Sequence, residues 1–254
     1  MNRLILLVIL IFPLSAQAEE CDYTRTIKKT LDATTLSELK VIARAGSLEI
    51  AGYKGGQDIQ LDAKLCASSK KNLKRMDVSF DADGKLGKIK TRIPSNNGLF
   101  FNGNNSINLV LKVPQRLPLD VDDSSGSAII EKVAALNIDD SSGSLVVRKV
   151  AGDVNINDSS GSIEVSEVQG SVFLSDSSGS ISAGNVSGDV LVKEDGSGSI
   201  SAKNVGGDFV VNADGSGSIS ALNIGRHFWV RQDGSGGISY KNVGGTVDIP
   251  ERKK

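Results

Sequence analysis

The chain has 254 residues, of which only 4% are aromatic and 28 are glycine, and its 29 basic residues nearly balance its 30 acidic ones. This balance excludes the strongly basic surface of a nucleic-acid-binding protein. The scarcity of large side chains predicts a narrow core built mainly from Val, Ile, Leu and Ala.

Residues 1–18 have the layout of a secretory signal peptide. A short basic start ending at Arg3 precedes an apolar run from Leu4 to Leu14, and small residues up to Ala18 form an A-x-A cleavage site. The apolar run is too short to span a bilayer. Losing Arg3 changes the net charge from −1 to −2. We therefore expect an exported protein without a transmembrane segment, in the periplasm or on the surface of a bacterium.

Two cysteines, Cys21 and Cys66, are predicted to form a disulfide, because an exported chain with one even pair and no C-x-x-C motif favours a structural bridge. The bridge would tie the mature N-terminus to the first part of the fold. We expect residues 19–65 to form an N-terminal cap and a first repeat unit. Residues 22–43 are predicted to add strands over the open end, with a helix at residues 35–43 as the alternative.

The first repeat unit is predicted from Gly46-Ser47-Leu48-Glu49-Ile50, a turn at residues 54–56 and a second strand at residues 59–61, which align with a later unit. Residues 66–114 have a different period and are predicted to be an excursion. Met76–Phe80 and Gly87–Ile93 flank Asp83-Gly84 as in a hairpin, and residues 106–113 read as another strand. The loop 94–105 is expected to carry Phe100 and Phe101 near its tip as candidate binding residues.

Residues 115–250 repeat a turn of the form D-(S/G)-S-G-(S/G) at intervals of 17, 18, 18, 19, 19 and 19 residues. The turns begin at Asp123, Asp140, Asp158, Asp176, Asp195, Asp214 and Asp233. A period this short predicts a solenoid. Each unit holds two short alternating stretches and no room for a helix. The fold is therefore predicted to be all-β, a parallel β-solenoid with two strands per rung, followed by a charged tail at 251–254.

Four columns of aliphatic residues are expected to point inward along the rod. They are represented by Val190, Val192, Ile200 and Val205, each with counterparts one period away. Glycines such as Gly170 and Gly188 are expected at positive φ in the second turn. Asn185, Asn204, Asn223 and Asn242 are predicted to form an amide ladder. The 19-residue units carry an extra residue before the turn (Glu194, Ala213, Gln232) and change D-S-S-G to D-G-S-G, which indicates a different turn geometry.

The order of these motifs resembles a known bacterial family. A G-S-L-E-I rung, a hairpin insertion, the stretch "LVLKVPQRLPLDVDDSSGS" and then tandem S-G-S-I turns are similar to the "putative adhesin" family of unknown function, over about residues 40–250. The resemblance implies a β-solenoid at the cell envelope or surface. It supplies no catalytic residues to this chain.

The stacked aspartates need a partner, because like charges about 4.8 Å apart repel one another. The first interpretation is that each Asp caps its own turn by accepting backbone N–H bonds. The alternative is Ca²⁺ held between rungs by Asp176, Asp195 and Asp214, although the G-G-x-G-x-D pattern of calcium β-rolls is absent. We expect no metal and no cofactor.

The second strand of each late unit also predicts an outward apolar row. Phe173, Leu191, Val210 and Trp229 alternate with the inward residues, and His227 and Arg231 flank Trp229. One interpretation is that the excursion folds back over this row. The other is a docking surface for an envelope protein or a glycan, with Trp229 as its anchor.

The function indicated is a non-enzymatic, exported, adhesin-like or scaffold module of the cell envelope. A polysaccharide-processing β-helix enzyme is the alternative, but the chain has a single histidine and no G-x-S-x-G elbow. The outward face of the first strand carries a row of serines in place of acid–base groups, namely Ser182, Ser201, Ser220 and Ser239. A spacer that binds nothing is the third possibility.

Overall fold

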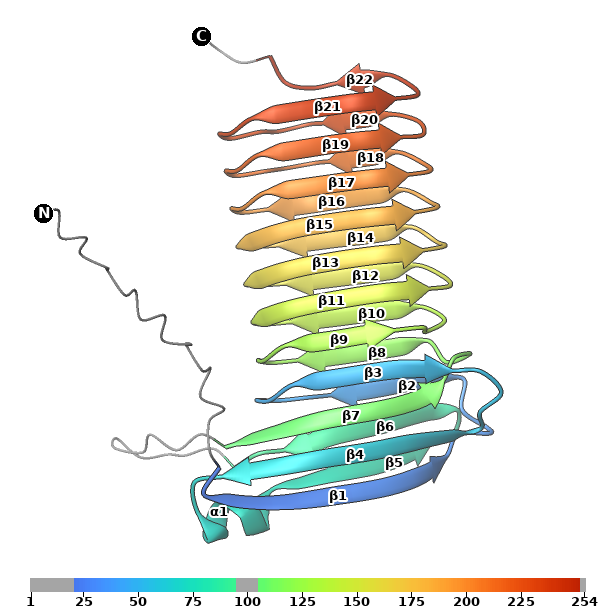
Figure 1. The fold of residues 1–254 in the computed structure, drawn as a ribbon, viewed down its shortest axis with the longest axis vertical. Helices are drawn as coiled ribbons and strands as arrows, with labels where there is room; N and C mark the ends of the chain where they lie inside the picture. Colours follow the sequence, from blue (N-terminus) through green and yellow to red (C-terminus); the bar gives the residue numbers. More distant parts are fainter. Residues whose placement is uncertain (1–20, 95–104, 252–254) are drawn as a thin grey trace, which may run out of the picture.

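The structure is a computed structural model that describes residues 21–94 and 105–251. The proposed signal peptide, the loop tip with Phe100 and Phe101, and the last three residues of the charged tail lie outside the described residues. The described chain forms a rod of two β-sheets that face each other, with the chain passing from one to the other in each rung (Figure 1). The predicted all-β parallel solenoid is confirmed.

Each sheet has eleven strands in the described part of the chain. The first sheet contains, in spatial order, β1 (Tyr23–Asp32), β4 (Asp58–Ala67), β7 (Ser106–Pro114), β3 (Leu48–Tyr53), β9 (Ala128–Glu131), β11 (Gly143–Val150), β13 (Gly161–Val168), β15 (Gly179–Val186), β17 (Ile200–Val205), β19 (Ile219–Ile224) and β21 (Ile238–Val243). The second contains β22 (Val247–Asp248), β20 (Phe228–Val230), β18 (Phe209–Val211), β16 (Val190–Asp195), β14 (Val172–Asp176), β12 (Val154–Asp158), β10 (Leu136–Asp140), β8 (Leu119–Asp123), β2 (Glu38–Ile42), β6 (Leu86–Arg92) and β5 (Asp77–Asp83).

The core is the narrow layer between the sheets, filled by the predicted aliphatic columns. Val190 and Ile200 are buried, and the register pairs each with its predicted counterpart in the next rung. One inward column changes from valine to Phe209 and Phe228, whose rings stack at a centroid distance of 5.2 Å. Because each rung buries its apolar face only against its neighbours, the stack as a whole supplies the hydrophobic stabilisation.

The expectation about positive φ in the second turn was wrong for the glycines. Gly170 and Gly188 do not have positive φ; the left-handed residue lies three positions earlier, at Glu167 and Asn185. The same site holds Lys132, Lys149, Asn204, Asn223 and Asn242 at φ of 56–60°. Glycine is needed for another reason: a β-carbon on Gly188 would lie 2.6 Å from the carbonyl oxygen of Gly170 in the rung behind.

The change from 18 to 19 residues is taken up by a β-bulge. The pairing of β14 with β16 runs in register to Leu174 and Val192 and then shifts, so that Ser175 lies opposite Glu194. The extra residue is therefore Lys193, one position before the predicted one. The D-G-S-G turn follows from close packing, because a β-carbon on Gly196 would overlap the carbonyl oxygen of Ser177.

The N-terminal end departs from the repeat. β2 and β3 form a rung beside β8 and β9, as predicted from Gly46–Ile50, and residues 35–43 contain the strand β2 rather than the alternative helix. The second half of that alignment was wrong, because residues 59–61 belong to β4, which runs antiparallel to β1 and β7 in the first sheet. The predicted disulfide joins Cys21 to Cys66 with a Cα–Cα distance of 5.5 Å.

The predicted hairpin is β5 and β6, which pair antiparallel around Gly84 at φ 59°. Instead of folding back along the rod, β5, β6 and β7 add strands to the N-terminal ends of the two sheets (Figure 1). A short helix that the sequence analysis missed, α1 (Lys70–Arg75), links β4 to β5 and is capped by Ser69. Among the described residues no helix is long and apolar enough to cross a membrane.

Candidate binding site

The strongest candidate surface is the outer face of the second sheet at its late rungs. The register places Phe173 beside Leu191, Leu191 beside Val210, and Val210 beside Trp229. Their neighbours on each strand point into the core, so these four side chains point outward, and each is half-buried. We call these four residues the apolar row. It follows the rod axis over four consecutive rungs, as the sequence predicted.

The expectation that the excursion covers the apolar row is wrong for the described residues. β6, the excursion strand nearest in the second sheet, is separated from β14 by β2, β8, β10 and β12. The excursion joins the sheets edge to edge because its strands also bury their apolar sides by continuing the core (Figure 1). An apolar row on a sheet face is the kind of surface that partner proteins use.

Trp229 is held in place at one end of the row. His227 stacks on its indole ring at 5.0 Å with an interplanar angle of 17°, and the Arg231 guanidinium lies over the ring at 5.5 Å. The indole Nε1–H donates to the Thr246 hydroxyl at 3.4 Å. These contacts confirm that His227 and Arg231 flank Trp229 on one face. Both neighbours lie against the ring and limit access to it.

His227 also belongs to a chain of side-chain-to-backbone hydrogen bonds that the sequence analysis missed. Its Nδ1 accepts the Thr246 N–H at 3.0 Å, and its own N–H donates to Asp208 Oδ1 at 3.0 Å. The Asp208 N–H donates in turn to Asp189 Oδ1 at 2.8 Å. This backbone bond, with an ion pair from Arg226 at 2.6 Å, lowers the pKa of Asp189. The signal available in the sequence was a polar residue directly before each second strand.

The other end of the apolar row meets a polar hollow of about 370 Å³, lined by residues that include Phe173, Asn157 and Lys193. Asn155 Nδ2 donates to Asn137 Oδ1 at 3.0 Å, and Asn157 Nδ2 donates to Asp139 Oδ1 at 3.2 Å. The outer face of the second sheet therefore changes from amide and carboxylate side chains in the early rungs to a row of apolar side chains in the late rungs.

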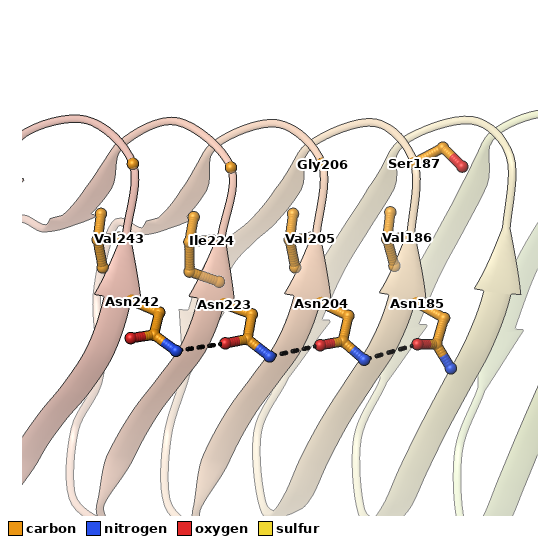
Figure 2. A pocket seen from close by; sticks show the side chains of 12 residues that line it. Asn185, Val186, Ser187, Asn204, Val205, Gly206, Asn223, Ile224, Asn242 and Val243 are labelled. Atoms are coloured by element: carbon orange, nitrogen blue, oxygen red, sulfur yellow. Dashed lines mark hydrogen bonds between the residues drawn. The ribbon is translucent and has the colours of Figure 1, made fainter.

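A second candidate surface lies where the strands of the first sheet end. The predicted amide ladder is present: Asn204, Asn223 and Asn242 each donate from Nδ2 to Oδ1 of the asparagine behind, at 2.8–2.9 Å (Figure 2). With Val205 inside and Gly206 on the turn, the ladder lines an open hollow of about 770 Å³. Each amide uses one N–H in the ladder, which leaves its second N–H for a ligand or water.

The aspartates of the repeated turns form a third feature, which we call the aspartate column: Asp123, Asp140, Asp158, Asp176, Asp195, Asp214 and Asp233. All except Asp233 are buried, at 1–4% exposure. Asp140, Asp158 and Asp176 each accept through Oδ1 the N–H of the serine two residues later, at 3.1–3.2 Å. This is the turn-capping geometry that the sequence predicted, and Asp123 accepts the N–H of Ser124.

The capping is incomplete. Oδ2 of Asp140, Asp158 and Asp176 has no hydrogen-bond partner. The oxygens of Asp195 and Asp214 lack a partner at full hydrogen-bond geometry and keep only a weaker interaction with the backbone N–H of Ser197 and Ser216. Burial and, to a lesser extent, the neighbouring aspartate together raise the pKa of Asp123 to about 7 and that of Asp140 to about 6. Burial, Asp176 and Asp214 together raise the pKa of Asp195 to about 6.

The calcium alternative finds no support in the column. Asp176, Asp195 and Asp214 lie one behind another, buried in the rod. In residues 21–94 and 105–251, no group of three or more acidic, histidine or cysteine side chains is placed to hold a metal ion. The arrangement can bind protons more readily than it can coordinate a cation.

Some solved structures that are similar to this chain carry names that agree with the predicted resemblance to putative adhesins. No family model matches the chain, and no curated protein matches it either. Among solved structures, the chain is similar to a "putative cell adhesion protein" from Clostridium sporogenes, at 11% identity and a TM-score of 0.39, over 89% of this chain and 99% of that one.

Two further structures are similar over comparable lengths. One is a "putative adhesin" from Bacteroides fragilis, at 15% identity and a TM-score of 0.34, over 89% of this chain and 97% of that one. The other is a "putative lipid binding protein" from Parabacteroides distasonis, at 18% identity and a TM-score of 0.42, over 90% and 96%. At these scores the fold assignment rests on the strand register of this chain itself.

Proposed function

We propose that this chain is an exported, non-enzymatic, adhesin-like binding module of the bacterial cell envelope, and that it holds a protein partner against the apolar row. The observation that carries the proposal is the in-register row of Phe173, Leu191, Val210 and Trp229 on an outer sheet face. Four adjacent half-buried apolar side chains on a rigid sheet lose little conformational entropy on binding. The disulfide between Cys21 and Cys66 supports export to an oxidising compartment.

A protein suits this row better than a glycan does. Sugars bind aromatic side chains through the ring face, and at Trp229 His227 and Arg231 lie against the ring. In the strand register Trp229 continues the row of Val210 and Leu191. Tryptophan beside arginine is also a common composition of the residues that dominate protein–protein binding energy. An enzymatic role is disfavoured because the chain has a single histidine and the outward side of the first strand in the late rungs carries serines in place of acid–base groups.

Site-specific crosslinking in bacterial envelope extract tests the proposal. A photoreactive residue at position 191 should capture a discrete protein partner. The double variant Trp229→Ala, Val210→Ser should lose at least about tenfold of the affinity for that partner, since central anchor residues contribute ~2 kcal/mol or more. The matched control is Val110→Ser, Ile129→Ser, which removes two apolar residues that are each 38% exposed in the other sheet.

The proposal fails if the double variant folds and binds as the wild type does, or if no partner is captured from position 191. Thermal unfolding by circular dichroism checks the fold of both variants. The enzyme alternative is tested by incubating the wild type with envelope polysaccharides. New reducing ends that disappear in His227→Ala would replace the proposal with a glycan-processing activity.

A further inference from the structure

The aspartate column is not used by the proposed binding site, and its burial without full hydrogen bonding requires an explanation. A buried carboxylate oxygen without a partner costs free energy, and several of them in a row also repel one another. In this column the costs fall on at least five consecutive rungs, from Asp140 to Asp214. A fully ionised column would therefore oppose the stacking of the rungs.

The amide ladder shows which kind of hydrogen bond would satisfy the buried carboxyl oxygens of the aspartate column. Its asparagines have the same turn-to-turn spacing, and their planar amides bridge it with N···O distances of 2.8–2.9 Å (Figure 2). A protonated carboxyl has the same planar shape as a carboxamide and has one O–H to donate. A protonated aspartate can therefore donate to a carboxyl oxygen in the next rung, as each asparagine does.

We propose that the aspartate column binds protons and shares them between rungs, so that folding of the rod takes up protons and the rod becomes more stable in mildly acidic surroundings. Protonating alternate aspartates is sufficient. Each ionised carboxylate then lies between two neutral carboxyl groups, and each neutral group has an acceptor. The like-charge repulsion between direct neighbours disappears, while Oδ1 of Asp140, Asp158 and Asp176 still caps its own turn.

The charged groups that act on the aspartate column do not neutralise its buried carboxylates. The groups that act electrostatically on its members are other aspartates of the column and, at its N-terminal end, Asp122. At the N-terminal end of the column the Arg44 guanidinium donates to the Ser124 hydroxyl at 2.8 Å. It interacts with the turn beside Asp123 and not with the buried carboxyl oxygens.

The direction of the pH effect follows from linkage. The pKa of Asp140 and of Asp195 is raised from 3.8 to about 6 in the folded chain, and that of Asp123 to about 7. A group whose folded pKa is raised contributes stability that is complete below its unfolded pKa and is lost as the pH rises through the folded one. Stability should therefore fall as the pH rises from about 4 to about 7.

Thermal unfolding of the full mature chain between pH 5 and pH 8 tests the proposal. The wild type should melt at least about 5 °C higher at pH 5 than at pH 8. The variant Asp195→Asn, Asp214→Asn places neutral amides in the column, so it should melt higher than the wild type at pH 8 and show a smaller pH dependence. The matched control Asp81→Asn, Asp248→Asn removes two exposed aspartates and should keep the wild-type pH dependence.

Infrared spectroscopy of the wild type gives an independent readout if the column variant does not fold. At pH 6, where ordinary aspartates are ionised, the carbonyl stretch of protonated carboxyl groups should be visible and should disappear on unfolding. A melting temperature that does not change between pH 5 and pH 8 would overturn the proposal. So would a wild-type spectrum at pH 6 without protonated carboxyl groups, or a folded column variant that melts lower than the wild type at pH 8.

Discussion

The early rungs of the rod, from β8 to β13, and the late rungs, from β14 to β21, build the same turn from different residues. The left-handed position carries Lys132, Lys149 and Glu167 in the early rungs and asparagine in every late one. In the early rungs Glu131 pairs with Lys132 at 2.7 Å and with Arg148 at 2.9 Å. In the late rungs the amide ladder replaces these ion pairs.

The comparison separates the backbone conformation, which the stacking of the rungs imposes, from the hydrogen bonds between rungs, which depend on the side chain. The backbone conformation is the same in both regions, so the stacking of the rungs imposes it. Asparagine tolerates it better than lysine or glutamate does, and it also bonds to the next rung. The late rungs also differ inside from β18 onward, because Phe209 and Phe228 occupy a column that holds Val154 in the early rungs and Val172 and Val190 in the first two late ones.

The largest effect should come from the late core. Phe209→Ala removes a fully buried ring that stacks on Phe228, and we expect a loss of about 3–5 kcal/mol in the free energy of unfolding. Urea unfolding measures the loss. Because rungs contact only their neighbours, hydrogen exchange should accelerate in β18 and β20 while β10 is protected.

The matched early variant is Val154→Ala, in the same column, which should cost less because a smaller group is removed. Equal acceleration of exchange in β10 and β18 of Phe209→Ala would contradict the view that the two regions differ locally, since it would show that the rod unfolds as one unit.

A medium effect is expected at the first turn. Gly196→Ser gives a late rung the D-S-S-G sequence of the early rungs, and its β-carbon would overlap the Ser177 carbonyl oxygen. We expect a cost of about 1–3 kcal/mol, as for other overpacked sites. Differential scanning calorimetry would show a lowered melting temperature.

The reciprocal change, Ser177→Gly in the preceding rung, is the control and should cost no more than about 1 kcal/mol. If Gly196→Ser were as stable as the wild type, the change from D-S-S-G to D-G-S-G would have no packing cause.

The smallest effect is a gain in stability. Glu167→Asn places an asparagine at the left-handed position one rung before Asn185, and it should extend the amide ladder and raise stability by about 0.5–1 kcal/mol. Side-chain amide signals in the NMR spectrum would report the new hydrogen bond. Glu167→Ala, which removes the charge without adding a ladder group, should give no gain; a similar gain in both variants would assign the effect to charge alone.

The sequence predicted the repeated part of the fold well because its signals are periodic. Val190 and Ile200 each recur in a column, and a column can only be buried if the rungs stack in parallel register. The amide ladder was predictable for the same reason, since Asn185 and its three counterparts recur at the period of the rungs.

The parts that were predicted wrongly depend on contacts between rungs or on chain direction. Gly188 was expected at positive φ, but its requirement comes from the Gly170 carbonyl behind it, which no local pattern reveals. β4 has the alternation of a rung strand, and alternation does not distinguish parallel from antiparallel pairing. Whether the excursion covers the apolar row or extends the sheets was also undetermined, because either arrangement buries the same alternating residues.

The sequence predicted which residues form the apolar row, but it did not predict the contacts that surround them. Alternation placed Trp229 outward beside His227 and Arg231, and the structure has them so. The contacts with Thr246 come from the following rung and have no sequence signal of their own. The incomplete hydrogen bonding of the aspartate column was likewise invisible, since capping and burial depend on where the rungs place each carboxyl.

Dependence on nearest neighbours has an evolutionary consequence. Asp195 to Ala213 is one 19-residue unit, and its two faces match the units on either side. Duplication or deletion of such a unit by unequal recombination leaves every remaining interface intact, so length is the property of this protein that is simplest to change. Each added copy lengthens the rod by about 4.8 Å. The number of repeats therefore sets how far the protein extends.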